Sequence, residues 1–91
     1  MTEHLHASHP NIVKRLKRAD GHLKSVIEMI ESGRPCVDIA QQLHAVEKAI
    51  QQAKKTLIHD HLDHCLDDAV TQDGPVDRAA IDGFREITRY L

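Results

Sequence analysis

Apolar residues recur along the N-terminal part of the chain with the spacing of an amphipathic helix. Steps of four and three alternate without interruption: Ile12, Leu16, Ala19, Leu23, Val26 and Ile30. This seven-residue repeat places apolar side chains along one stripe of a helix. Pro10 suits the first turn of a helix, and Gly33 suits the position after its last turn. The pattern therefore predicts a helix that begins near Pro10 and ends before Gly33.

A second stretch, which opens at Pro35, repeats the pattern at six positions: Ile39, Leu43, Val46, Ile50, Ala53 and Leu57. A Gly-Pro pair at positions 74 and 75 interrupts it, and a third, short helix is predicted over residues 76–91. The prediction is an all-α fold with three helices per chain. Because a single hairpin leaves much of its two apolar stripes exposed, we expect two copies to associate as an antiparallel four-helix-bundle dimer.

Candidate metal ligands occupy the two ends of the second stripe. Cys36 lies three residues before Ile39, and His61 and Cys65 lie four and eight residues after Leu57. Thiolates and imidazoles are common ligands of transition-metal ions. His61 and Cys65 are one helical turn apart and therefore share a face.

Cys36 is too far along the same helix to share an ion with His61 of its own chain. It precedes His61 by 25 positions, which is about 38 Å at the helical rise. If the second helix packs antiparallel against its copy, each Cys36 lies beside His61 and Cys65 of the other chain. We therefore predict two equivalent sites per dimer. The surrounding acids are expected to face solvent, although one of them could orient His61: Asp60, Asp63, Asp67 and Asp68.

The N-terminal segment is rich in histidine. Residues 1–9 contain His4, His6 and His9 and are predicted to form a flexible tail. A single helical domain is predicted over residues 10–91. The tail either has no role in the metal site or folds over it and adds a nitrogen ligand.

Charge is distributed unevenly along the chain. Residues 11–55 carry nine Lys or Arg and five Asp or Glu, whereas residues 56–91 carry three and eight. A basic cluster in the first helix is joined by Lys48, Lys54 and Lys55 in the second. The candidate DNA-binding residues among these are Lys14, Arg15, Lys17, Arg18 and Lys48. Such a surface can neutralise DNA phosphates, but it is also typical of a solvated helix face. No helix-turn-helix or zinc-finger pattern accompanies it.

The composition narrows the class of protein. The chain has 91 residues, two cysteines and no secretory signal. No apolar run approaches the roughly 20 residues of a membrane span. These features predict a cytoplasmic protein that does not contact a membrane. Glycine-rich phosphate loops and nucleophile motifs are missing, so an enzyme is not predicted.

Three stretches resemble the CsoR/RcnR family of bacterial metal-sensing repressors: "IVKRLKRADGHLKSVIEMIESGRPC", "DIAQQLHAVEKAI" and "HDHLDHC". The resemblance covers nearly the whole chain. It implies an all-helical homotetramer, formed by two dimers, that binds operator DNA through a basic helical surface when metal-free. Effector binding between protomers then releases the DNA, and the regulated function implied by the family is metal efflux.

The resemblance also implies a ligand set. The family's ligand positions fall on Cys36, His61 and Cys65, and its variable N-terminal position falls on His4. Copper sensors of the family look like Cys-His-Cys sites, and nickel and cobalt sensors add an N-terminal histidine. Because a histidine-rich tail has no purpose in a three-coordinate copper site, we favour Ni(II) or Co(II) as the effector, with Cu(I) as the alternative.

Two departures from the family pattern bear on DNA binding. His22 and Glu47 stand where family members commonly have Gln and Arg. Because Glu47 is negatively charged, we expect the second helix to contribute less to the DNA-binding surface. Two rival functions use the same residues: a metal-buffering or carrier protein, and a thiol redox switch built on Cys36 and Cys65.

Overall fold

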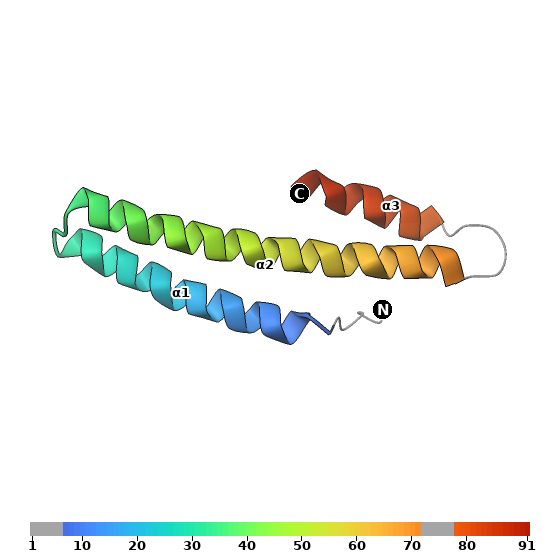
Figure 1. Cartoon of the computed structure of the whole chain (residues 1–91), viewed down its shortest axis with the longest axis horizontal. Helices are drawn as coiled ribbons and strands as arrows, with labels where there is room; N and C mark the ends of the chain where they lie inside the picture. Colours follow the sequence, from blue (N-terminus) through green and yellow to red (C-terminus); the bar gives the residue numbers. More distant parts are fainter. Residues whose placement is uncertain (1–6, 72–77) are drawn as a thin grey trace. The chain divides into compact units, whose positions relative to one another are not determined.

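The computed structural model describes residues 7–71 and 78–91, and within these ranges the chain is helical, with no strand (Figure 1). The elements are three α-helices and a terminal 3-10 helix: α1 (His9–Glu31), α2 (Cys36–Thr71), α3 (Arg78–Ile87) and η1 (Thr88–Tyr90). The prediction of an all-α chain with three helices is confirmed, and α1 and α2 begin within one residue of the predicted positions. No helix within the described ranges is long and apolar enough to cross a membrane.

Gly33 ends α1 as the sequence predicts. Its φ angle is +73°, in the left-handed region that glycine adopts without strain. The Arg34 N–H donates to the Met29 carbonyl (3.0 Å), and the Gly33 N–H donates to the Ile30 carbonyl (3.2 Å). This pair of bonds is a Schellman motif, which satisfies the last carbonyls of the helix. Pro35 then starts α2, because its carbonyl accepts from the Ile39 N–H at 3.1 Å.

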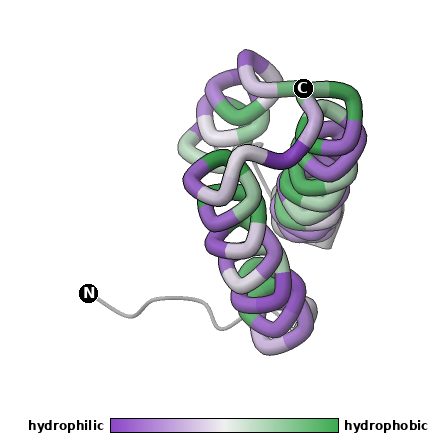
Figure 2. The backbone as a smooth tube through the Cα atoms, turned by 90° about the vertical axis from the view of Figure 1, so that its left-hand side faces the viewer, coloured by the Kyte–Doolittle hydropathy of each residue, from purple (hydrophilic) through white to green (hydrophobic). Residues whose placement is uncertain are grey.

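The described residues divide into two compact units: residues 10–54 form one, and residues 7–9, 55–71 and 78–91 form the other. In the first unit α1 runs antiparallel to the beginning of α2 (Figure 1). Hydrophobic and hydrophilic residues alternate along the helices (Figure 2), as the sequence pattern requires. The first unit is therefore the helical hairpin that the two apolar stripes predict.

The apolar stripes of the hairpin divide into two halves. Positions seven residues apart are buried: Ile12, Ala19 and Val26 on α1, and Val46 and Ala53 on α2, whereas Ile39, the first of this series on α2, is half-buried. The intervening positions are exposed: Leu16, Leu23 and Ile30 on α1, and Leu43 and Ile50 on α2. Leu16 is 43% and Ile50 is 45% exposed. One half of the repeat thus forms the core of the hairpin, and the other half is left for a further packing partner.

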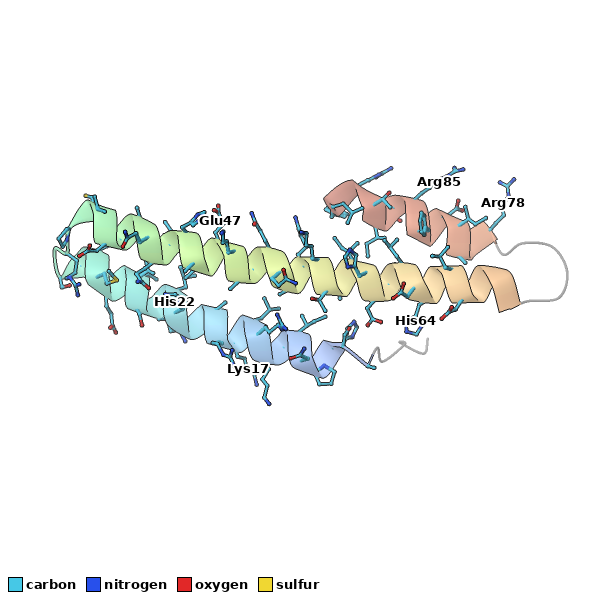
Figure 3. All side chains as sticks on the ribbon, viewed as in Figure 1. Lys17, His22, Glu47, His64, Arg78 and Arg85 are labelled. Atoms are coloured by element: carbon cyan, nitrogen blue, oxygen red, sulfur yellow. The ribbon has the colours of Figure 1, made fainter. Side chains whose placement is uncertain are left out.

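The second unit contains the later part of α2 and the whole of α3. Ile58 of α2 is only 2% exposed, and Phe84 and Ile87 of α3 are half-buried. The Arg78 and Arg85 side chains project from α3 away from α2 (Figure 3). The third helix predicted over residues 76–91 is confirmed for Arg78–Ile87, and a 3-10 helix follows it from Thr88 to Tyr90.

Candidate nucleic-acid interface and metal ligands

A basic hollow of about 590 Å³ opens between α1 and the first half of α2. Its lining combines four cations with neutral polar and small residues: Asn11, Lys14, Arg15, Arg18, Ala19, His22, Lys48, Ala49 and Gln52. No acidic side chain is among these described lining residues. The hollow therefore presents a concentrated positive charge to any ligand that enters it.

Helix geometry explains why these cations converge. Lys14 and Arg18 are four residues apart on α1 and lie on one face, with Arg15 beside them. Lys48 comes from the antiparallel helix, 30 positions after Arg18 in the sequence, and completes the hollow. The fifth predicted residue, Lys17, is not part of the lining, and Figure 3 shows its side chain projecting away from α2.

His22, which lines the hollow, joins α1 to α2 by a hydrogen bond beside it. Its Nε2 donates to Oε1 of Gln42 on α2, at 2.7 Å. The sequence pattern did not mark Asn11 or Gln52 as part of this surface, and it marked His22 only as a departure from the family pattern. A signal was present, because each lies four residues from a predicted cation on the same helix. The three pairs are Asn11 with Arg15, Arg18 with His22, and Lys48 with Gln52.

Glu47 lies outside the basic hollow. It lines a separate groove of about 390 Å³ whose other residues are mostly apolar: Leu23, Leu43, Val46, Ile50 and Gln51. Its Oε1 is 3.6 Å from Nδ1 of His44. Because successive residues of a helix point in directions about 100° apart, Lys48 lines the hollow while its neighbour Glu47 does not. Glu47 therefore lowers the positive potential of the hollow less than its position next to Lys48 in the sequence suggests.

The predicted metal ligands are distributed over the chain. Cys36 is the first residue of α2 and is exposed, with its thiol in no disulfide. His61 lies on the same helix and is partly exposed. Cys65 is also on α2, but its side chain lies outside the described residues, as does the whole of His4. Among the described side chains no group of three or more His, Cys, Asp or Glu is arranged to hold a metal ion.

Asp60, immediately before His61, does not face solvent freely as the sequence suggested. Its side chain is 19% exposed, and its Oδ1 lies 3.8 Å from Nε2 of His64. Its Oδ2 accepts a hydrogen bond from the hydroxyl of Ser8, which precedes α1. The expectation of a solvated Asp60 is therefore wrong, because Ser8 and His64 contact this carboxylate.

Sequence comparison identifies the family. The model of the metal-sensitive transcriptional repressors matches residues 8–90. The chain belongs to this family, which is the CsoR/RcnR family that the sequence resembles. Members of the family are transcriptional repressors and not enzymes.

Two relatives matched by sequence are named as copper sensors. The copper-sensing transcriptional repressor CsoR of Mycobacterium ulcerans is 40% identical over 78 residues, which are 86% of this chain and 65% of that protein. The copper-sensing repressor CsoR of Bacillus subtilis is 36% identical over 81 residues, 86% of this chain and 79% of that protein. The chain thus spans slightly less than two thirds of the mycobacterial relative.

Structure comparison matches the nickel-responsive transcriptional regulator InrS. The TM-score is 0.82 and the sequence identity is 26%, over 99% of this chain and 100% of that chain. The fold of the chain is therefore that of a solved member of the same family.

Proposed function

We propose that this chain is a metal-responsive repressor that binds operator DNA when metal-free and releases it on binding Ni(II) or Co(II). The observation that carries the DNA-binding role is the basic hollow, where Lys14, Arg15, Arg18 and Lys48 converge without an acid. A backbone phosphate meets several cations there at once, and release of its counterions drives association. A buffering or carrier protein has no need of such a surface.

The donor set supports a transition-metal effector. Cys36 and Cys65 supply thiolates, His61 supplies an imidazole, and His4 is proposed as a further nitrogen ligand. Two thiolates with two nitrogens suit Ni(II) in a planar arrangement, and Co(II) with additional ligands. The likeness to nickel-responsive InrS supports Ni(II) as the effector. The likeness to the copper-sensing CsoR proteins supports Cu(I) as the alternative, held by Cys36, His61 and Cys65 alone.

Association of chains is needed to complete the proposed site. The exposed half of the apolar repeat, with Leu23, Leu43 and Ile50 along one groove, is the surface on which a second hairpin packs. An antiparallel four-helix bundle buries these residues and brings Cys36 of one chain to His61 and Cys65 of the other. Two such dimers form the homotetramer typical of the family.

Replacing an apolar residue of this groove by an acid is expected to dissociate the assembly. Ile50→Glu places a charge where the second hairpin packs, and burial of an unpaired carboxylate is costly. Sedimentation velocity should show smaller species than the wild type at equal concentration. The matched control is Gln41→Glu, which adds the same charge at an exposed position of α2 outside the groove. An unchanged sedimentation coefficient for Ile50→Glu contradicts the proposed interface.

Titration of the reduced, anaerobic protein with Ni(II) tests the effector. We expect a thiolate-to-nickel absorption band and planar-type d–d absorption that saturate at about one ion per chain, since each dimer has two equivalent sites. His4→Ala is expected to lose the planar signature while keeping both thiolates, and His6→Ala is its control. Absence of a thiolate band with Ni(II), together with tight stoichiometric binding of Cu(I), replaces nickel by copper as the effector.

A further inference from the structure

A hydrogen bond joins the ligand-bearing part of α2 to the residue before α1. The Ser8 hydroxyl donates to the Asp60 carboxylate, across 52 positions of sequence. Asp60 directly precedes the proposed ligand His61, and Ser8 directly precedes α1. The bond therefore links the turn that carries the proposed ligand His61 to the start of the helix that carries Lys14 and Arg15.

Several properties distinguish this bond from an ordinary surface contact. Asp60 is 19% exposed, whereas the side chain of His64, its neighbour one turn later, is 48% exposed. A carboxylate that is largely withdrawn from water needs hydrogen-bond donors. A hydroxyl donor to a charged acceptor makes one of the stronger side-chain bonds. Oδ2 receives Ser8, while Oδ1 faces His64, so the carboxylate bridges the two elements.

We propose that Ser8 and Asp60 form a latch that holds the start of α1 and that metal binding must open. The inference rests on the proposed function, in which metal and DNA favour different conformations. A rearrangement of the His61 turn relative to α1 alters the Ser8–Asp60 bond, because each partner is adjacent to one of the moving parts. The latch thus opposes metal binding and sets the metal concentration at which DNA is released. In this role Asp60 is a positioning residue and not a ligand.

The sign of the effect separates the latch from a purely structural contact. If opening the bond is part of metal binding, its removal makes metal binding easier. Ser8→Ala is therefore expected to raise the Ni(II) affinity of the DNA-free protein by about three- to thirtyfold, the range for residues that couple two sites. Loss of a contact that only supports the fold would lower the affinity. Loss of a carboxylate that orients His61 would lower it by about 10- to 100-fold in Asp60→Ala and leave Ser8→Ala unchanged.

The experiment measures Ni(II) affinity by competition with a chelator for five full-length proteins: wild type, Ser8→Ala, Ser8→Thr, Asp60→Ala and the double variant Ser8→Ala/Asp60→Ala. Ser8→Thr keeps the hydroxyl and is expected to match the wild type. Asp63→Ala removes the same charge from an exposed position near His61 and gives the electrostatic part of the Asp60→Ala effect. Once this electrostatic effect is subtracted, the Ni(II) affinity of the double variant is expected to match that of either single variant. The reason is that all three variants lose the same Ser8–Asp60 bond.

Each result decides the matter. Tighter Ni(II) binding by Ser8→Ala, with restoration by Ser8→Thr, supports the latch, and Ni(II) should then release a selected operator duplex at lower concentration. Unchanged or weaker binding by Ser8→Ala overturns the latch, even if the wild type still releases DNA with metal. If the wild type binds no operator or keeps it at saturating metal, the proposed function fails and the latch fails with it.

Discussion

Replacement of Cys36 by alanine or serine is expected to leave operator binding intact and to abolish its release by metal. Cys36 is exposed at the first position of α2, so its loss creates no cavity in the core of the hairpin. The wild type is expected to lose about 5- to 150-fold in DNA affinity when metal is bound, the usual range of such coupling. In Cys36→Ala the ratio of the DNA affinity without metal to the DNA affinity with metal should fall to about one. Fluorescence anisotropy of a labelled operator duplex, with and without Ni(II), measures it.

Mixed assemblies test whether Cys36 acts across the chain boundary. Cys36→Ala and His61→Ala are each expected to be unresponsive to metal. In a mixed dimer of the two, Cys36 of one chain meets His61 of the other, so one of the two sites is complete. Differently tagged variants, refolded together and purified as mixed species, should regain about half of the wild-type Ni(II) stoichiometry. Mixed dimers without any thiolate-to-nickel band contradict a shared site.

Neutralisation of a cation in the basic hollow is expected to weaken operator binding by metal-free protein about tenfold, the value of one charge-assisted hydrogen bond. Arg15→Ala and Lys48→Ala should each show this loss, although they lie on different helices, because both line the same hollow. The slope of log affinity against log salt concentration should become shallower by about 0.9 for each DNA phosphate that the variant no longer neutralises. Anisotropy titrations at four or more salt concentrations provide both quantities.

Two lysines outside the hollow serve as controls for this prediction. Lys24 is exposed on α1, and its Nζ is 3.2 Å from the Asp20 carboxylate. Lys24→Ala should therefore change operator affinity little. Lys17 belongs to the basic cluster in the sequence but not to the hollow. If Lys17→Ala costs as much as Lys48→Ala, the DNA follows the outer face of α1 and the hollow is not the centre of the interface.

Reciprocity extends these predictions to the metal. If metal lowers the affinity for DNA by some factor, DNA lowers the affinity for metal by the same factor. Variants of the hollow that no longer bind operator should therefore bind Ni(II) as tightly as the DNA-free wild type. The two variants therefore test the basic hollow and the proposed metal site separately. Lys48→Ala is expected to change only DNA binding, and Cys36→Ala is expected to change only the response to metal.

The sequence by itself determined the elements of the fold and part of the candidate sites. Its periodicity and its Gly33 and Pro35 signals located both long helices, because capping and helix propensity depend on residues within a turn or two. The cations of α1 were also visible, since a spacing of three or four defines a helix face. The ligand set of Cys36, His61 and Cys65 is a prediction that follows from spacing and family resemblance.

Only the tertiary structure decided which surfaces these elements share. It divided each apolar stripe into a buried and an exposed half, placed Lys48 in the hollow and Glu47 outside it, and brought Ser8 to Asp60. All three depend on how one helix is rotated and aligned against a segment distant in sequence. A local pattern does not contain that rotation, because it is fixed by the packing of many side chains from both segments at once.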